Sequence, residues 1–365
     1  MAMTLRRERT TFWRQARREE RRTRQPVPPL LPFGAVVRVP ERGDVFVRYR
    51  PGPAGAPTVL LLHGWMASAD LNWIGTFGAL ADRYHVVAMD HRGHGRGIRT
   101  TERFTLEDCA DDAAGLLDAL GVRSAIVAGY SMGGPISLLL ARRHPHQVRG
   151  LVLVASAAEL APRGLERGMA VFARFLGPMF RSGLLDGALR LFAGREPAVL
   201  GDLAGAAPWM AGEMKRLHPS DVVGAGVAIA GFDGRAWVES LSVPAASVVT
   251  TRDRAVPPDN QLATAVALDG WVIELDAGHT VCVTDPEAMG AAVRQAVDLV
   301  AGRRWFGRAE RWLRTRVITT ATDQPSRSVG SHPAMDPITT DRTVELVETE
   351  PQRESSTFEA MSSSR

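Results

Sequence analysis

One serine in this chain lies where an enzyme would place a nucleophile. Ser131 is the centre of Gly-Tyr-Ser-Met-Gly, between the apolar run 125–128 and a second apolar run, 136–141, of helical length. The flanking glycines let the main chain pass close to itself at a dihedral angle that other residues disfavour, so the serine is lifted clear of the sheet. The first turn of the following helix offers free N–H groups and a dipole that favours negative charge. The pattern predicts a nucleophilic serine whose oxyanion is stabilised.

Other chemically active side chains share this position relative to a strand. Like Ser131, the residues His63, Asp253 and His279 lie just after apolar runs of strand length. Because the ends of parallel strands collect loops at one edge of a sheet, we expect these side chains to lie near one another. The N–H group of Trp65 is a candidate donor to an oxyanion, whereas His63 is expected to hold its loop by hydrogen bonds and to transfer no proton.

The elements needed to position these residues alternate along the chain from about residue 35 to residue 300. This alternation predicts an α/β fold, with a mostly parallel eight-stranded sheet covered by helices on both faces. The expected strands are residues 35–39, 44–49, 58–62, 85–89, 125–128, 150–155, 245–250 and 271–275. The expected helices include residues 71–81, 105–120, 285–300 and 303–317.

Changes in composition divide the chain into segments. Residues 34–156 and 242–318 form the predicted core, and residues 157–241, with glycine-interrupted helical patterns, form a predicted helical cap. Residues 1–33 are predicted to be a flexible basic arm, because closely spaced prolines follow an Arg/Glu-rich segment. Residues 319–365 are rich in Ser, Thr and Glu without periodicity, which predicts a disordered tail.

Apolar side chains of the predicted cap recur at helical spacing. They are Met169, Phe172, Leu176, Phe180, Leu184, Leu185, Leu189 and Phe192, and three further apolar candidates are Trp209, Met210 and Met214. Packing onto the core is the favoured interpretation. The alternative is that some of them line an acyl pocket, because small-molecule sites are mostly apolar clefts.

The composition is that of a globular protein with unevenly distributed charge. Of 365 residues, 45% are hydrophobic and 23% charged, and the formal net charge is +4. Residues 1–25 contain nine Arg and three Glu, whereas residues 320–365 contain four Arg and eight acids. The segment between them is close to neutral, so nucleic-acid binding by the core is not expected. Phe12 and Trp13 could touch an anionic membrane, but a solvated arm is favoured.

No cofactor or metal is expected from the sequence. Cys109 and Cys282 lie in different elements without ligand spacing, which also argues against a disulfide framework. His91 and His94 lie three residues apart, but no further ligand cluster accompanies them. No run of 18 apolar residues occurs, and no apolar segment of a signal peptide follows the first arginines. A cytoplasmic protein of undetermined oligomeric state is expected.

The combination of motifs resembles the α/β-hydrolase superfamily, in particular its serine-nucleophile members with a helical cap. The resemblance covers about residues 35–300. Its motifs are His-Gly-Trp at 63–65, Asp-His-Arg-Gly-His-Gly at 90–95, Gly-Tyr-Ser-Met-Gly-Gly at 129–134, the Arg-Asp and Val-Pro-Pro block around Asp253, and Ala-Gly-His ending at His279. The order of nucleophile, acid and histidine is that of this fold.

The resemblance implies a catalytic triad and an oxyanion hole. His279 would take the proton of Ser131, which attacks a carbonyl carbon, while Asp253 orients the imidazole. The N–H groups of Met132 and Trp65 would bind the oxyanion.

Two other acids compete for the role of Asp253. Asp259 and Asp276 lie near the expected residues, but neither stands at the position of the family's acid. A serine in place of an aspartate at the elbow also argues against the haloalkane dehalogenases and epoxide hydrolases of the superfamily.

The activity predicted from this resemblance is hydrolysis of a carboxylic ester of a small to medium lipophilic substrate, without a cofactor. The same triad also supports carbon–carbon bond, thioester or lactone hydrolysis and acyl transfer, which motifs do not separate. A binding protein with a vestigial site is a third, less favoured interpretation.

Overall fold

The computed structural model describes residues 31–160, 209, 212–213, 216–217, 219–302 and 317–319, all within one unit of the chain, residues 1–322. The predicted N-terminal arm up to residue 30, most of the predicted cap and the predicted tail from residue 320 lie outside the described residues. All the cap side chains named above lie outside them too, except that of Trp209.

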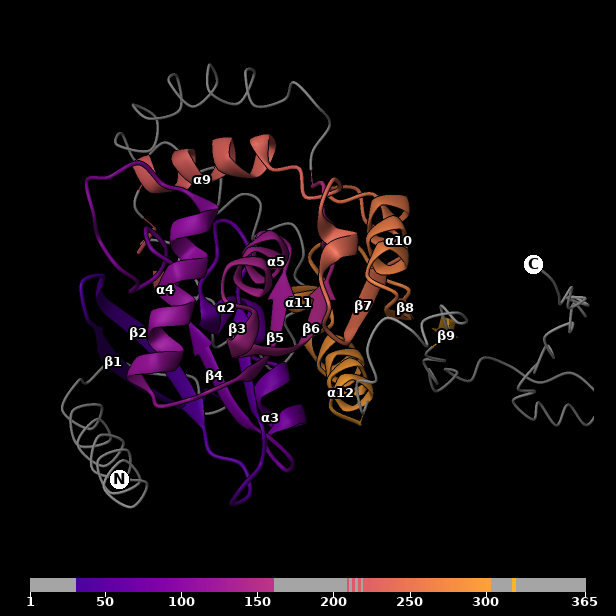
Figure 1. The fold of residues 1–365 in the computed structure, drawn as a ribbon, viewed down its shortest axis with the longest axis horizontal. Helices are drawn as coiled ribbons and strands as arrows, with labels where there is room; N and C mark the ends of the chain where they lie inside the picture. Colours follow the sequence, from indigo (N-terminus) through magenta and orange to yellow (C-terminus); the bar gives the residue numbers. More distant parts are fainter. Residues whose placement is uncertain are drawn as a thin grey trace, which may run out of the picture. The chain divides into compact units, whose positions relative to one another are not determined.

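A single sheet runs through the described part of the chain, in the order β1-β2-β4-β3-β5-β6-β7-β8-β9 (Figure 1). Its strands are β1 (Phe33–Val39), β2 (Gly43–Arg50), β3 (Thr58–Leu62), β4 (His85–Met89), β5 (Ala125–Tyr130), β6 (Val148–Val154), β7 (Ala245–Thr250), β8 (Trp271–Leu275) and β9 (Val317–Thr319). Strands β1, β2 and β4 pair antiparallel, and all other pairs are parallel. The predicted α/β fold with a mostly parallel sheet is confirmed.

The centre of the sheet is buried on both faces. Every residue of β5 and β7 is buried, which explains why their sequences read as continuous apolar runs without alternation. Successive side chains of β3 point to opposite faces, since Val59 belongs to one apolar cluster and Leu60 to the other. Strand β5 lies between β3 and β6, so the end of β5 is at the middle of the sheet.

Helices cover both faces of this sheet (Figure 1). The described helices of ten or more residues are α4 (Leu106–Ala119), α5 (Gly133–Arg143), α9 (Pro219–Gly231), α10 (Pro258–Ala267) and α12 (Pro286–Gly302). Side chains of α4 and α5 join the cluster that contains Leu60, and side chains of α12 join the cluster that contains Val59. The start of α4 follows capping rules, because the Thr105 hydroxyl accepts a hydrogen bond from the Asp108 N–H at 3.0 Å.

Three local predictions differ from the structure. The single helix expected over 71–81 is two short helices, α2 (Ala69–Trp73) and α3 (Thr76–Leu80). They are separated at Gly75, where a Cβ atom would lie 2.1 Å from the carbonyl oxygen of Pro286, so the chain bends at this close contact with α12. A four-residue helix, α11 (Val281–Thr284), was not predicted.

The third difference is the ninth strand. Residues 317–319 pair in parallel with β8, whereas the sequence pattern predicted a helix ending at Val317 and a tail beginning at Thr319. Val317, Ile318 and Thr319 are all β-branched, which favours a strand. The remainder of the predicted helix, residues 303–316, lies outside the described residues.

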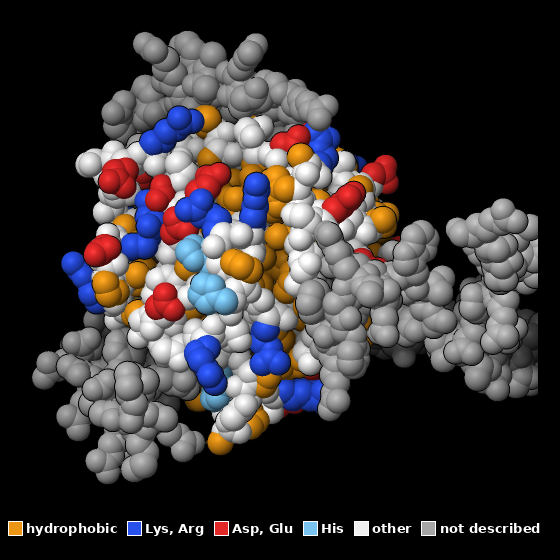
Figure 2. Space-filling view, viewed as in Figure 1, with side chains coloured by type: hydrophobic (Ala, Val, Ile, Leu, Met, Phe, Trp, Pro, Cys, Tyr) orange, Lys and Arg blue, Asp and Glu red, His pale blue; other side chains and the backbone are white. Residues whose placement is uncertain are grey.

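The surface carries both charges on the face that Figure 2 shows. Arginines and acids are interspersed around exposed hydrophobic side chains there. No helix in the described ranges has both the length and the apolar character that crossing a bilayer requires.

Candidate active site

The turn between β5 and α5 places Ser131 at the carboxyl edge of the sheet. Ser131 has a φ of 50°, which is rare for a residue with a side chain and marks a tight turn. Two glycines make the turn possible. A Cβ atom at Gly129 would lie 2.2 Å from the carbonyl oxygen of Gly133, and a Cβ atom at Gly133 would lie 2.1 Å from that of Leu62. Close main-chain contacts at these two glycines therefore help to fix the position of Ser131.

A chain of hydrogen bonds joins three of the predicted residues. Ser131 Oγ lies 2.9 Å from His279 Nε2, and His279 Nδ1 lies 2.8 Å from Asp253 Oδ2. The Asp253 carboxylate is fully buried, whereas the His279 side chain keeps 25% of its surface exposed. A hydroxyl, an imidazole and a carboxylate in this order form the arrangement that transfers a proton away from a serine.

The surroundings of Asp253 favour its ionised form. Its Oδ1 atom accepts hydrogen bonds from the N–H groups of Ala255 at 2.8 Å and Val256 at 2.9 Å, and Oδ2 accepts one from Thr250 Oγ1 at 2.8 Å. Burial alone would raise the pKa of Asp253. Hydrogen bonding and charge from His279, with these further donors, outweigh burial and lower the pKa below its ordinary value.

Two N–H groups lie beside the serine without an acceptor in the described part of the chain, those of Trp65 and Met132. Met132 precedes the first turn of α5, where helix N–H groups are free. A Cβ atom at Gly64 would lie 3.2 Å from Ser131 Cβ, so the loop that carries Trp65 passes directly next to the serine. These are the two N–H groups that the sequence predicted as donors to an oxyanion.

The loop after β3 is held by buried polar side chains. His63 Nδ1 pairs with the Gly64 carbonyl at 2.7 Å, and His63 Nε2 accepts the His91 N–H at 2.9 Å. Burial lowers the pKa of His63 to about 4, so it is neutral at physiological pH. The Gly64 N–H donates to Asn72 Oδ1 at 2.7 Å. His63 therefore has the structural contacts that its position predicted.

Side chains around His279 hold its loop as well. The hydroxyl of Tyr130, the residue before Ser131, donates to the His279 carbonyl oxygen. Asn72 Nδ2 lies 3.3 Å from Cys282 Sγ, so one amide joins the loop of Trp65 to the loop of His279. Burial raises the pKa of the Cys282 thiol, which disfavours the reactive thiolate.

The competing acids lie elsewhere. Asp276 is exposed and pairs with Arg252 at 2.8 Å, and Asp259 stands in the first turn of α10. Burial lowers the pKa of His91 and, to about 3, that of His94. Among the described residues, no cluster of His, Cys, Asp or Glu has the geometry of a metal site.

Some residues that support this site were not identified from sequence motifs. Thr250 and Gln261 bond the Asp253 carboxylate, and Tyr130 and Asn72 support the His279 and Trp65 loops. Tyr130 stands inside the Gly-Tyr-Ser-Met-Gly motif, whereas Thr250, Gln261 and Asn72 lie three to eight residues from the groups that they bond.

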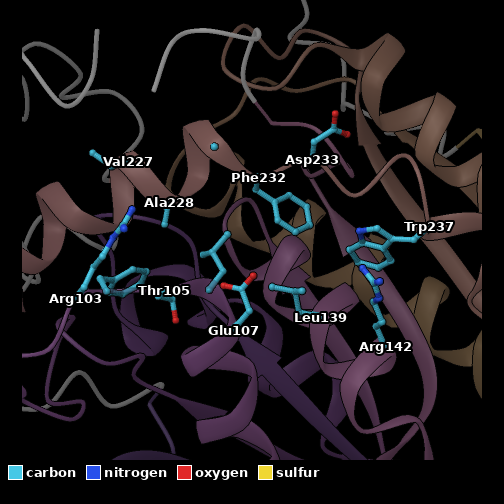
Figure 3. Close-up of a pocket in the computed structure, with 13 residues that line it drawn as sticks. Arg103, Thr105, Glu107, Leu139, Arg142, Val227, Ala228, Phe232, Asp233 and Trp237 are labelled. Carbon is cyan, nitrogen blue, oxygen red and sulfur yellow. The ribbon is translucent and has the colours of Figure 1, made fainter. Parts of the chain in front are cut away.

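A cavity of about 410 Å³ lies apart from these residues, between α9 and the helices α4 and α5 (Figure 3). Its lining includes Phe104, Leu139, Ala228 and Trp237, with Arg142 stacked 4.6 Å from the centre of the Trp237 ring. Ser131 and His279 are absent from its lining.

Comparison with known proteins agrees with this geometry. The sequence profile of the family described as "alpha/beta hydrolase fold" matches residues 57–286, which include every residue of the hydrogen-bonded chain. This protein therefore belongs to the alpha/beta hydrolase fold family.

Among individual relatives, a protein of Caulobacter sp. strain K31, provisionally named carbamate hydrolase RutD, is 29% identical over 260 residues, 66% of this chain and 91% of that protein. Further relatives match over shorter stretches, 29–42% of their own length.

Two solved structures illustrate the similarity in fold. The enol-lactonase from Burkholderia xenovorans LB400 has a TM-score of 0.56 at 26% identity, over 70% of this chain and 97% of that one. A thermophilic esterase from Thermogutta terrifontis has a TM-score of 0.60 at 22% identity, over 73% of this chain and 98% of that one. The second likeness shows the fold alone.

Proposed function

We propose that this protein is a serine hydrolase that cleaves a carboxylic ester of a small to medium lipophilic substrate through an acyl-enzyme on Ser131. The observation that carries the proposal is the hydrogen-bonded chain from Ser131 Oγ through His279 to Asp253, with distances of 2.9 and 2.8 Å. The half-buried serine lies beside two N–H groups with no acceptor among the described residues.

The reaction begins when His279 Nε2 takes the proton of the Ser131 hydroxyl as Oγ attacks the ester carbonyl carbon. Asp253 stabilises the imidazolium that forms, and the N–H groups of Trp65 and Met132 donate to the oxyanion, each worth about 3 kcal/mol in serine hydrolases. Collapse of the tetrahedral intermediate breaks the ester C–O bond, and His279 gives its proton to the departing alcohol. Water, deprotonated by His279, then attacks the acyl-enzyme and releases the acid.

The test is hydrolysis of a chain-length series of p-nitrophenyl esters by the wild type and by Ser131→Ala. We expect the wild type to turn over with an optimum in acyl length and the variant to lose about 10⁴-fold or more in kcat. Ser240→Ala is a matched control, because its exposed hydroxyl bonds only the nearby Trp237 carbonyl among described residues, and it should stay within about twofold of wild type. Equal rates for wild type and Ser131→Ala would reject the assignment of the nucleophile.

Hydrolysis of a lactone or a carbamate is the second candidate, supported by the names of an enol-lactonase and a carbamate hydrolase among the relatives. Both bonds present a carbonyl carbon to the same serine. The two candidates separate by the ratio of kcat/KM values for a p-nitrophenyl ester, a p-nitrophenyl carbamate and a lactone of matched size. We expect the ester to be preferred; a carbamate or lactone favoured tenfold would establish the second candidate.

A further inference from the structure

The main chain beside Trp65 is held by two buried side chains. The carbonyl oxygen of Gly64 and the N–H group of Trp65 belong to one planar peptide unit, so holding the first sets the direction of the second. Neutral His63 accepts the His91 N–H at Nε2, which leaves the ring proton on Nδ1, and Nδ1 donates to the Gly64 carbonyl at 2.7 Å. Asn72 Oδ1 accepts the Gly64 N–H at 2.7 Å. His63 and Asn72 therefore orient the proposed oxyanion donor.

Asn72 makes a second hydrogen bond, to the loop of the proposed base. Because Oδ1 accepts from Gly64, the other end of the amide is its NH₂ group, which donates to Cys282 Sγ at 3.3 Å. Cys282 lies in α11, three residues after His279. The side chains of Asn72 and Cys282 are buried, so little water competes for this bond. One amide thus binds the loop of the oxyanion donor with its oxygen and the loop of the base with its nitrogen.

Tyr130, the residue before Ser131, contacts the same two parts of the chain. Its ring packs edge-on against that of Trp73 in α2, with ring centres 6.1 Å apart, and its hydroxyl donates to the His279 carbonyl oxygen. Burial raises the pKa of Tyr130 and the neighbouring Cys282 raises it further, so the hydroxyl keeps its proton and remains a donor. The strand end that carries the nucleophile is therefore attached both to α2 and to the loop of the base.

The segment before α9 and the first turns of α9 also bond side chains of the loop after β3. The Trp65 indole Nε1 donates to the Val222 carbonyl oxygen at 2.7 Å. The buried Glu213 carboxylate accepts a hydrogen bond from Ser68 Oγ at 3.1 Å. These two bonds end on side chains of the loop, whereas the bond of Asn72 ends on its main chain, next to the Trp65 N–H. Asn72 therefore acts on the main chain of this loop directly.

We propose that Asn72 and Cys282 are positioning residues that couple the oxyanion donor to the loop of His279. The amide holds the two loops at one separation, so that the N–H group and the imidazole face the nucleophile together. Without the thiol, the NH₂ group loses its partner and the amide can rotate away from Gly64, so a change at Cys282 reaches the oxyanion donor. The loss falls on the transition state, so kcat falls while KM stays almost unchanged. This inference rests on the proposed function.

The test is a double-mutant cycle of Asn72→Leu and Cys282→Ala on the preferred p-nitrophenyl ester. Leucine has nearly the size of asparagine but neither a donor nor an acceptor. We expect kcat to fall about tenfold in Asn72→Leu and about threefold in Cys282→Ala, each with KM within about twofold of wild type. If both residues act through one contact, the double variant should lose no more than about tenfold, whereas independent effects would give about 30-fold.

Two further cysteine variants complete the cycle. Cys109→Ala removes the other cysteine of the chain, which is buried in α4, and should keep kcat within about twofold of wild type. Cys282→Ser keeps an acceptor for the Asn72 amide and should recover most of the kcat lost in Cys282→Ala. This pair of Cys282 variants decides the question should Asn72→Leu not fold. Independent losses in the cycle, or a Cys282→Ser variant no faster than Cys282→Ala, would overturn the inference.

A readout without turnover separates this inference from the proposed function. The rate at which a fluorophosphonate labels Ser131 depends on the base and the oxyanion donor but on no natural substrate. If the wild type is labelled yet hydrolyses no ester, ester hydrolysis is rejected, while non-additive losses in labelling rate still support the coupling. Variants that unfold at lower urea but label at the wild-type rate would show a contact that serves stability alone, which rejects the coupling. A wild type that is neither labelled nor active would reject both proposals.

Discussion

The two sides of the candidate active site are built in different ways. Ser131 is placed by the main chain: two glycines allow its turn, and the carboxylate that ends the proton chain accepts two main-chain N–H groups. The side facing α9 is placed by side chains, through the Trp65 indole and the buried Glu213 carboxylate. The Gly129 contact and the N–H groups that bind Asp253 lie within four residues of their partners, whereas both side-chain contacts join segments more than 100 residues apart.

The largest effect is expected at the main-chain side, from Asp253→Asn. The asparagine amide has no negative charge to stabilise the His279 imidazolium. Its NH₂ group also cannot accept the hydrogen bonds that a carboxylate oxygen of Asp253 accepts, so kcat should fall about 10⁴-fold. Steady-state kinetics on the preferred p-nitrophenyl ester measure the change. Asp276→Asn, which alters an exposed acid near His279, should remain within twofold. A comparable loss in Asp276→Asn would transfer the role to that acid.

Gly129→Ala should be the next most damaging change. The new methyl group would lie 2.2 Å from the Gly133 carbonyl oxygen, so the elbow must open, at a cost of about 3 kcal/mol in the free energy of unfolding. Urea denaturation measures it. Gly78→Ala adds the same methyl group to an exposed helical position with free space and should stabilise the protein by about 0.5–1 kcal/mol. Similar values for both variants would show that the elbow is not fixed by its glycines.

The smallest effect is expected at the side-chain junction, from Glu213→Gln. Burial raises the pKa of Glu213 more than the charge of Arg96 lowers it, and Asp70 and Asp90 raise it further. The folded protein therefore binds this proton more tightly than the unfolded chain, so ionised Glu213 costs stability above its raised pKa. The variant should be as stable as wild type at pH 7.5, or more stable by up to about 1 kcal/mol.

The advantage of Glu213→Gln should shrink as the pH falls through the raised pKa towards the ordinary value of 4.5, because wild type then gains the proton. Urea denaturation at pH 7.5 and pH 5 gives both values. Asp233→Asn, at an exposed acid paired with Arg235, is the control. Its free energy of unfolding should differ from that of wild type by an amount that changes little with pH. A large loss of stability in Glu213→Gln at neutral pH would mean that the buried charge itself stabilises the junction.

The contrast between local contacts and contacts with distant segments also explains which features the sequence predicted. Ser131, Asp253 and His279 each follow a strand within a few residues, so local patterns placed them at one edge of the sheet. Gly75 was not recognised as a break, because its close contact is with Pro286, over 200 residues away. The Trp65 bond to Val222 joins equally distant segments and has no local pattern. Sequence reasoning therefore recovered the residues that follow strand ends, including the contacts of His279 with Ser131 and Asp253, and missed the contacts that Gly75 and the Trp65 indole make with distant segments.

The pairing of β6 with β7 has a consequence for how this protein can evolve. The two strands lie side by side in continuous parallel register from Leu151↔Ala245 to Val154↔Val248, although residues 155–244 separate them in sequence. Because the cost of closing a flexible loop grows only by about 0.6 kcal/mol for each doubling of its length, the sheet tolerates insertions and deletions between these strands. A segment of another length between these strands therefore leaves the pairing of β6 with β7, and with it the sheet that positions Ser131, Asp253 and His279, unchanged.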